Sequence, residues 1–363
     1  MELSFLRPLY EVPGPVLSVH LDTSREDQDA DKRIEIVWQG LKRDLQDQGA
    51  DLPTLNAIEQ AVGGSPDLVG AQGEALFAAD GQLLAVHTLA APPTRNRATA
   101  GPVADALETA LDRDRQLPYV VVAIDRQGAE IDGYALGAFD PTLSRSFNGS
   151  TLHITRVKTG GPSKASYHRR TQNLWDRNAA AVAEEIVDAV NAVDAAVVFV
   201  GGDDKATAAL RDQPAVQGLD VEIVDISGGR GGQDAVASLR KSLDDGLAAA
   251  SQRAHNKAFQ EYASAIGTGS GVSSIPTVAD ALAEGRVGTL LLSANIPQSP
   301  SKWSSDRSPL MVASSAHPLD DNSAFEMPAP ALLLRAATLS NSNFTEIPAD
   351  QKVTDGCGAT LRF

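Results

Sequence analysis

The sequence predicts an α/β protein with a three-domain architecture, in which mixed sheets are covered by helices. Apolar runs of strand length alternate with segments whose apolar residues recur every three or four positions, which is the pattern of an α/β layer domain. The chain has 363 residues, a length for which two or three domains are expected. From the order of these segments we place the domains at residues 1–115, 116–251 and 252–363.

The first domain is predicted to hold a strand, a helix, a hairpin and a second helix. In the first helix, Ile34, Trp38 and Leu41 recur at spacings of four and three, so they share one face. The hairpin is indicated by Asp80 and Gly81, a pair that tight hairpin turns favour. The four elements are expected at residues 14–23, 30–49, 73–89 and 103–116.

The second domain alternates strand and helix patterns. Its long helix has an apolar stripe in which Ala179, Val182, Ile186 and Val190 follow Trp175 at steps of four and three. Two glycine-rich segments each follow a strand and open a helix, where backbone N–H groups can hold an anion. Strands are predicted within residues 118–136 and 151–157, the long helix at 166–193, and two strand-loop-helix units at 195–212 and 221–243.

The third domain is predicted to combine helices with several short strands. A Gly/Ser-rich linker follows its first helix, and the polar, Pro-containing residues 297–309 have the composition of an exposed insertion. The first helix is expected at residues 254–267, a helix and strand at 277–296, and further strands at 329–337, 343–348 and 358–363.

Composition excludes several classes of protein. The formal net charge is −16, from 31 basic and 47 acidic residues, which disfavours bulk nonspecific binding of nucleic acid. No apolar run approaches the ~18 residues that a membrane span needs. The N-terminal residues lack a signal-peptide pattern, and the single cysteine, Cys357, fits a reducing compartment. We therefore expect a cytoplasmic protein.

The sequence contains no constellation that predicts catalysis. The six histidines and Cys357 lie at no metal-ligand spacing, so we expect no metal and no cofactor. The glycine-rich segments 201–210 and 228–236 match neither phosphate-loop pattern, and we interpret them as turns between strand and helix. No serine lies in a nucleophile elbow. The protein is therefore predicted not to be an enzyme.

The segment from residue 156 to residue 177 departs from this acidic background. It carries one acid, Asp176, six basic residues, and a Gly160-Gly161 pair that permits close backbone approach. Basic residues in the first turns of a helix oppose its macrodipole, at roughly a few tenths of a kcal/mol each, so such a cluster usually has an anionic partner. Tyr167 adds a ring that can stack on a base. The basic residues are Arg156, Lys158, Lys164, Arg169, Arg170 and Arg177.

This arrangement resembles the central domain of the archaeal and eukaryotic class-1 release factors. In that family a Gly-Gly-Gln loop followed by Ser leads into a helix with an aromatic residue and paired arginines. Here Gly160, Gly161 and Ser163 match the loop, while Tyr167 and the arginine pair 169–170 match the helix. The resemblance covers residues 116–363 well and the first domain weakly. Further stretches resemble later family motifs in the same order: "VVFVGGDDKATAALRD", "DISGGRGGQDAVASL", "TVADALAEGRVGTLLLS" and "GCGATLRF".

Two departures from the family pattern bear on function. Pro162 stands where the family has the glutamine that positions water at the ester of peptidyl-tRNA, and proline has neither an amide side chain nor a backbone N–H. The first domain also lacks the patterns with which the family reads stop codons. A literal Gly-Gly-Gln occurs at Gly231-Gly232-Gln233, but by motif order it lies at a later turn between strand and helix. We do not assign it to peptide release.

The resemblance implies a bacterial, Pelota-like factor of the ribosome-hibernation type, as in the Balon-like proteins of actinobacteria. Such a stress-response factor occupies the A site of idle or stalled 70S ribosomes without peptide release, with its basic loop directed to the peptidyl-transferase centre. The implied partners are large-subunit rRNA, the small-subunit decoding region and EF-Tu, with no DNA and no membrane. The predicted rRNA-binding residues are Arg156, Lys158, Gly160, Gly161, Pro162, Ser163, Lys164, Tyr167, His168, Arg169, Arg170 and Arg177.

Two alternatives stay open. One is a ribosome-rescue factor that hydrolyses stalled peptidyl-tRNA, with Gln233 as its candidate residue. The other is a ribosome-independent stress protein that has kept only the fold. Peptidyl-tRNA hydrolysis separates the first alternative from hibernation, and sedimentation with ribosomes separates the second.

Overall fold

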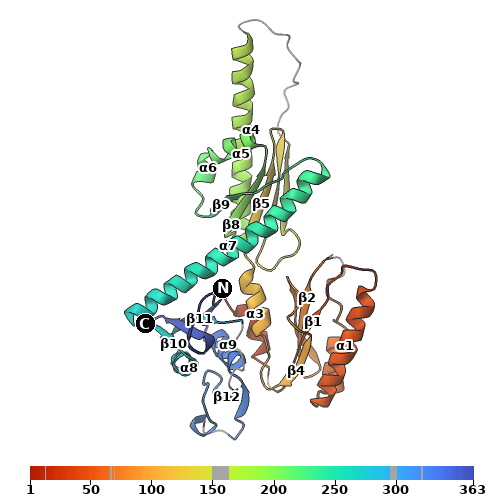
Figure 1. Ribbon diagram of the computed structural model, residues 1–363, viewed down its shortest axis with the longest axis vertical. Coiled ribbons are helices and arrows are strands. Elements are labelled where there is room, and N and C mark those ends of the chain that lie inside the picture. Colours follow the sequence, from red (N-terminus) through yellow and green to blue (C-terminus); the bar gives the residue numbers. More distant parts are fainter. Residues whose placement is uncertain (13, 66–67, 69, 149–162, 295–300, 320–321) are drawn as a thin grey trace. The chain divides into compact units, whose positions relative to one another are not determined.

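The computed structural model describes the chain except for residues 13, 66–67, 69, 149–162, 295–300 and 320–321. The described residues form two compact units. The terminal unit joins Met1–Asp114 with Ala254–Phe363, and the central unit is Arg115–Arg253. The first and third predicted domains thus lie in one unit, while the predicted α/β class is confirmed (Figure 1). Among the described residues, no helix combines the length and the apolar character that a membrane crossing requires.

The N-terminal part of the terminal unit is an antiparallel sheet covered by two helices. The described strands pair in the order β3-β2-β1-β4, and α1 and α2 bury Ile34, Trp38 and Leu55 against one face. The predicted hairpin is confirmed, and its turn places Asp80 and Gly81 at φ values of 49° and 74°. The elements are η1 (Ser4–Leu9), β1 (Val16–Asp22), α1 (Ala30–Asp47), α2 (Leu52–Glu59), β2 (Gly73–Ala79), β3 (Gln82–Leu89), β4 (Arg97–Gly101) and α3 (Leu107–Arg115).

The C-terminal part of the terminal unit holds a second sheet, of mixed direction. Its described strands follow the order β10-β15-β11-β14, with β11 and β14 parallel. The predicted helix and strand at 277–296 and the last two strands are confirmed. The elements are β10 (Gly271–Ser273), α8 (Ile275–Ala283), β11 (Val287–Leu292), β12 (Ser301–Ser304), η2 (His317–Leu319), β13 (Phe325–Pro328), α9 (Ala329–Leu339), β14 (Asn343–Glu346), η3 (Thr354–Gly356) and β15 (Cys357–Leu361).

Two predictions for this region are wrong. Residues 329–337 form helix α9 and not a strand, because a helix buried on all sides carries the same unbroken apolar run as a buried strand. Pro330 in its first turn is a helix-start signal that the apolar run concealed. The predicted exposed insertion also contains strand β12, which pairs with β13 in a two-stranded ribbon.

The two parts of the terminal unit share one hydrophobic core. Leu6 of η1 and Phe77 of β2 belong to the same buried cluster as Leu282 of α8 and Phe344 of β14. Each of these four side chains is fully buried. Burial of this kind stabilises a fold by roughly 2 kcal/mol per large apolar side chain. The N-terminal and C-terminal parts therefore stabilise each other.

The central unit is built on one mixed sheet. Its described strands follow the order β7-β6-β5-β8-β9, in which β5, β8 and β9 run parallel and β6 and β7 are antiparallel neighbours. Strand β7 was not predicted, and the strand predicted at 151–157 lies outside the described residues. The strands are β5 (Tyr119–Ile124), β6 (Gly128–Tyr134), β7 (Leu143–Asn148), β8 (Val197–Gly202) and β9 (Glu222–Asp225).

Helices pack on both faces of this sheet. Helix α4 (Ser163–Val193), α5 (Asp204–Arg211) and α6 (Pro214–Gln217) share a core with one face, and α7 (Gln233–Thr268) covers part of the other. The helix of the strand-loop-helix unit at 221–243 and the helix at 254–267 were predicted to be separate, but α7 is one continuous helix. Gly246 lies inside α7, although glycine often ends a helix. Its place is close to the Phe199 ring, and a Cβ there would be 2.7 Å from that ring, so packing favours glycine at this position.

Candidate nucleic-acid interface

Helix α4 is anchored in the central unit by its C-terminal half. Val182, Ile186 and Val190 are buried in the core formed with β5, β6 and β8, and Ala179 is buried too, which confirms these four positions of the predicted stripe. Its last turn is held where the Ala195 N–H donates to the Val190 carbonyl at 3.0 Å. The C-terminal half of α4 therefore has a fixed place on the sheet.

The N-terminal half of α4 carries most of the predicted RNA-binding residues. Its residues 163–177 span ~22 Å at about 1.5 Å per residue, and Figure 1 shows the helix continuing past the sheet of its own unit. The structure describes the backbone of this half, and the side chains lie outside the description. The residues on this half are Ser163, Lys164, Tyr167, His168, Arg169, Arg170 and Arg177.

The remaining predicted interface residues precede α4. Arg156, Lys158, Gly160, Gly161 and Pro162 lie outside the described residues. The chain reaches them from β7, whose last residue, Asn148, pairs with Gly128 at the start of β6. Strand β5 ends beside that point, so β7 ends at the carboxyl edge of the parallel strands. This edge is where open α/β sheets usually bind ligands.

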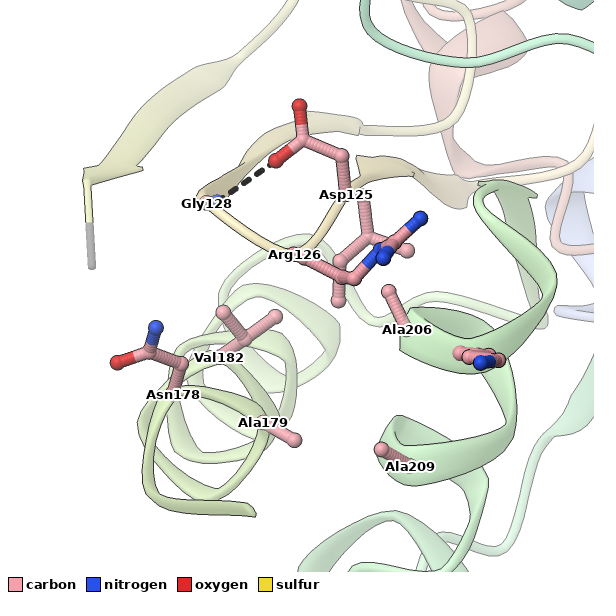
Figure 2. A pocket seen from close by; sticks show the side chains of 10 residues that line it. Asp125, Arg126, Gly128, Asn178, Ala179, Val182, Ala206 and Ala209 are labelled. Atoms are coloured by element: carbon pink, nitrogen blue, oxygen red, sulfur yellow. Dashed lines mark hydrogen bonds between the residues drawn. The ribbon is translucent and has the colours of Figure 1, made fainter. Parts of the chain in front are cut away.

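A small hollow lies at the same edge, beside the first described side chain of α4. It measures about 20 Å³, room for about one water molecule. Figure 2 shows Val182 and Ala179 of α4 facing Ala206 and Ala209 of α5 across it, with Asn178 at its rim. Arg126 and Lys205 complete its polar border. A hollow of this volume is too small to hold a nucleotide.

The charged side chains at this edge neutralise one another. Arg126, in the turn after β5, lies 2.9 Å from Asp203, in the turn after β8. Arg230, in the turn after β9, lies 3.3 Å from Asp125 and 3.5 Å from Glu130. The three turns are therefore cross-linked by ion pairs, in which neighbouring carboxylates neutralise Arg126 and Arg230.

The carboxylates of Asp125 and Asp203 both accept hydrogen bonds that stabilise the turns. Asp125 Oδ1 accepts hydrogen bonds from the N–H groups of Gln127 at 2.7 Å and Gly128 at 2.9 Å, which shapes the β5–β6 turn (Figure 2). Burial raises the pKa of Asp203, but hydrogen bonds from Arg126 and Ala206 outweigh burial, so its pKa lies below the usual value. An acid with a lowered pKa stays ionised near neutral pH and is unsuited to general acid catalysis.

Close packing of the backbone explains the glycines in these turns. A Cβ on Gly202 would lie 1.8 Å from the Ile124 carbonyl oxygen, and one on Gly229 would lie 2.7 Å from the Gly202 Cα. The turns after β8 and β9 therefore touch backbone to backbone, which fits our interpretation of both segments as turns between strand and helix. Within the described residues, no group of three or more His, Cys, Asp or Glu side chains could hold a metal ion.

The literal Gly-Gly-Gln lies in the turn between β9 and α7. Gly231 and Gly232 end the turn after β9, and Gln233 is the first residue of α7. A Cβ on Gly232 would meet no atom within 4 Å, so this part of the turn is open. The structure thus places the motif between a strand and a helix, as motif order predicts.

Sequence reasoning missed the ion-pair network at the carboxyl edge. Each of the three parallel strands is followed within a few residues by a charged side chain, namely Arg126, Asp203 and Arg230. We treated two of these turns only as glycine segments. Because the carboxyl ends of parallel strands share one edge, this repeated placement was a usable signal.

A family model matches most of the central unit and the rest of α7. Residues 118–268 match the model of bacterial archaeo-eukaryotic release factor family 2. The match begins one residue before β5 and ends with the last residue of α7, so it contains the whole sheet, the basic segment and the carboxyl-edge turns.

The whole chain also has similar proteins. Uncharacterized protein Rv2629 of Mycobacterium tuberculosis is 27% identical over 373 aligned positions, which cover 99% of this chain and 96% of that protein. An archaeal translation termination factor, aRF1, is 15% identical, covers 99% of this chain and 96% of its own, and has a TM-score of 0.25. Pelota of Archaeoglobus fulgidus is 12% identical, with a TM-score of 0.36, and the match covers 80% of this chain and 79% of that chain. Residues 118–268 of this chain are thus similar to bacterial archaeo-eukaryotic release factor family 2.

Proposed function

We propose that this protein binds the ribosome, occupies the A site of idle or stalled ribosomes and releases no peptide. The observation that carries the proposal is the position of the basic segment. It lies inside the family-matched residues and runs directly into a helix whose other half is anchored in the core. In release factors the corresponding loop is directed to the peptidyl-transferase centre, which is built of RNA.

The distribution of charge supports this orientation. Residues 156–177 hold six basic residues and one acid, whereas the rest of the central unit holds 9 basic and 17 acidic residues. Residues 156–177 therefore attract phosphate, whereas the rest of the central unit repels it. The central unit is therefore expected to approach RNA with the N-terminal end of α4 leading.

The absence of peptide release is proposed from Pro162. Release needs a group that positions water at the ester, and a proline at the tip offers no side-chain amide and no backbone donor. A proline in general restricts its own φ to about −65° and disfavours a helical conformation at the residue before it. The tip is thus expected to occlude the site and to be chemically inert.

A rescue factor acting through Gln233 is the second candidate. Gln233 starts α7 and follows two glycines, so a Gly-Gly-Gln sequence is present. However, Arg230 in the same turn is paired with Asp125 and Glu130, which ties this turn to the sheet. A loop tied to the sheet is poorly suited to reach a distant ester.

A protein partner is also proposed, on the family resemblance alone. By that resemblance, EF-Tu is expected to contact the predicted third domain, residues 252–363, or the part of the chain where this domain follows the predicted second domain, residues 116–251. Co-purification of EF-Tu with ribosome-bound protein, compared with ribosomes lacking the protein, tests this part of the proposal separately.

Binding of labelled protein to ribosomes with different A-site occupancy tests the proposed function. We expect saturable binding to ribosomes with a vacant A site, and loss of binding when a tRNA fills that site. Equal binding in both cases would contradict A-site occupancy. Failure to sediment with either kind of ribosome would favour the ribosome-independent alternative.

A further inference from the structure

The terminal unit contains a buried ionic contact at the place where the chain leaves it and returns. Asp114 is its last residue before the central unit, and His255 is the second residue after the chain comes back. Both residues are 8% exposed, and His255 Nε2 lies 3.0 Å from Asp114 Oδ2. The segment that leaves and the segment that returns are thus fastened to each other within the terminal unit.

The carboxylate of Asp114 is also held by the second sheet. The Glu346 N–H of β14 donates to Asp114 Oδ2 at 2.7 Å, and the Met1 ammonium lies 3.6 Å from Asp114 Oδ1. His255 Nε2 lies 3.2 Å from the Asp114 carbonyl oxygen as well. Since both neighbours of Nε2 are acceptors, this nitrogen carries a proton. The contact therefore joins α3, α7 and β14 at one point.

We propose that the Asp114–His255 contact is a protonation-sensitive clamp on the two connections to the central unit. When His255 carries a positive charge, the clamp is an ion pair in a buried setting and holds α3 and α7 together. When His255 is neutral, only a hydrogen bond remains, and the two connections separate more readily. The range of orientations available to the central unit then increases.

The groups around His255 set the pH at which the clamp changes. Burial lowers the pKa of His255, but the hydrogen bond and charge of Asp114, together with the charge of Glu346, outweigh burial and raise it above its usual value. The Met1 ammonium is the positive group that faces the same carboxylate. A raised histidine pKa means that the clamp is complete below about pH 6.5 and weakens as pH rises through the higher, folded value.

Fluorescence energy transfer between the two units tests the clamp directly. Gln46→Cys on α1 and Gln217→Cys on α6 provide exposed labelling sites, and the native Cys357 is buried and so escapes labelling. Single molecules of the full chain are followed from about pH 6 to about pH 8. Wild type is compared with His255→Gln and with His317→Gln, an exposed histidine of the same unit.

In wild type and His317→Gln, most molecules are expected to share one energy-transfer efficiency. We expect the fraction of molecules with other efficiencies to rise with pH. The rise is up to about tenfold for each pH unit by which folding raises the His255 pKa. In His255→Gln, that fraction is expected to be high at every pH. A pH dependence that survives in His255→Gln overturns the proposal.

An NMR titration of wild type needs no substitution in the clamp. The His255 ring is expected to titrate above the usual histidine pKa of about 6.5. Titration of the His255 ring at or below about pH 6.5 overturns the proposal even if the variants fail to fold.

Discussion

Arg126 and Asp203 join the turns that follow two neighbouring parallel strands, with the Arg126 Nη2 atom 2.9 Å from Asp203 Oδ2. Asp203 also begins α5, where its Oδ1 accepts a hydrogen bond from the Ala206 N–H at 3.3 Å. One carboxylate thus caps a helix and fastens the turn after β5. The anchored C-terminal half of α4 packs against α5. The Arg126–Asp203 contact, which holds the start of α5, is therefore expected to support α4 as well.

Loss of the cap should destabilise the central unit. We expect Asp203→Ala to lower the free energy of unfolding by about 1 kcal/mol, since an N-cap carboxylate satisfies a helix N–H group. Asp212→Ala is the matched control, because Asp212 lies at the C-terminal end of the same helix, where a negative charge opposes the macrodipole. Hydrogen exchange of the α5 amides measures both effects, and equal behaviour of the two variants would argue against the capping role.

Removal of Arg126 should raise the pKa of Asp203. Arg126→Ala leaves the burial of the carboxylate but removes its hydrogen-bonded cation, so the pKa moves up toward its usual value. A lowered carboxylate pKa contributes stability above about pH 4 that is lost as pH falls, and this contribution is expected to shrink in the variant. NMR titration of the Asp203 side chain provides the measurement, and an unchanged pKa would rule out Arg126 as the cause.

Two glycine substitutions distinguish the packed turns from the literal Gly-Gly-Gln. Gly202→Ala should cost about 3 kcal/mol or more, because its Cβ would lie 1.8 Å from the Ile124 carbonyl oxygen and its φ is +151°. Gly232→Ala should change the free energy of unfolding by less than about 0.5 kcal/mol, because a Cβ there meets no atom within 4 Å. Denaturant unfolding of both variants checks this, and comparable costs would contradict the packing argument.

Acid should destabilise the terminal unit through a buried histidine. Burial, then the charges of Arg97 and His87, lowers the pKa of His20 to about 3. The folded state therefore keeps His20 neutral while the unfolded chain binds a proton below about pH 6.5. Stability is expected to fall as pH drops from about 6.5 toward 3, by at most about 1.4 kcal/mol per pH unit.

Hydrogen exchange of the β1 and β2 amides reports this effect for the terminal unit alone. We expect His20→Gln to flatten the dependence on pH, whatever its effect on stability at pH 7. The exposed His317→Gln should keep the wild-type slope. A wild-type slope in His20→Gln would assign the acid sensitivity to other groups.

Charge reversal in the basic helix should change how ribosome binding responds to salt. Arg169→Glu with Arg170→Glu is expected to weaken binding and to lower the slope of log affinity against log salt by ~1 for each phosphate that the variant no longer neutralises. Arg240→Glu with Lys241→Glu is the matched control, an adjacent exposed basic pair on α7. Filter binding over a salt series provides the slopes, and identical slopes for the two double variants would exclude α4 as the RNA-binding element.

Sequence patterns predicted most elements whose apolar residues have a clear period. The α1 face with Ile34, Trp38 and Leu41 and the Asp80-Gly81 turn are local features, so periodicity and turn chemistry were sufficient. Helix α9 was predicted as a strand because burial on every side removes the period. A short apolar run inside a folded core cannot be assigned from its own residues alone.

The candidate interface was only partly accessible from sequence. The basic cluster stands out by charge against an acidic chain, and the apolar stripe from Ala179 onward predicts where α4 is anchored. The pairing of Arg126 with Asp203, and of Arg230 with Asp125, depends on strand order. Strand order is set by long-range contacts and not by local pattern, so these partners became visible only in the fold.

The central proposal is tested most directly by release of labelled peptide from ribosomes that carry peptidyl-tRNA. The release is followed with and without puromycin, a small mimic of aminoacyl-tRNA that needs the A site. We predict that saturating wild-type protein releases no peptide and slows release by puromycin. Pro162→Gln should keep that inhibition, with at most slight release of its own, and Gln233→Ala should behave as wild type. Peptide release by wild type that disappears in Gln233→Ala, or puromycin release that the protein does not slow, would contradict the account.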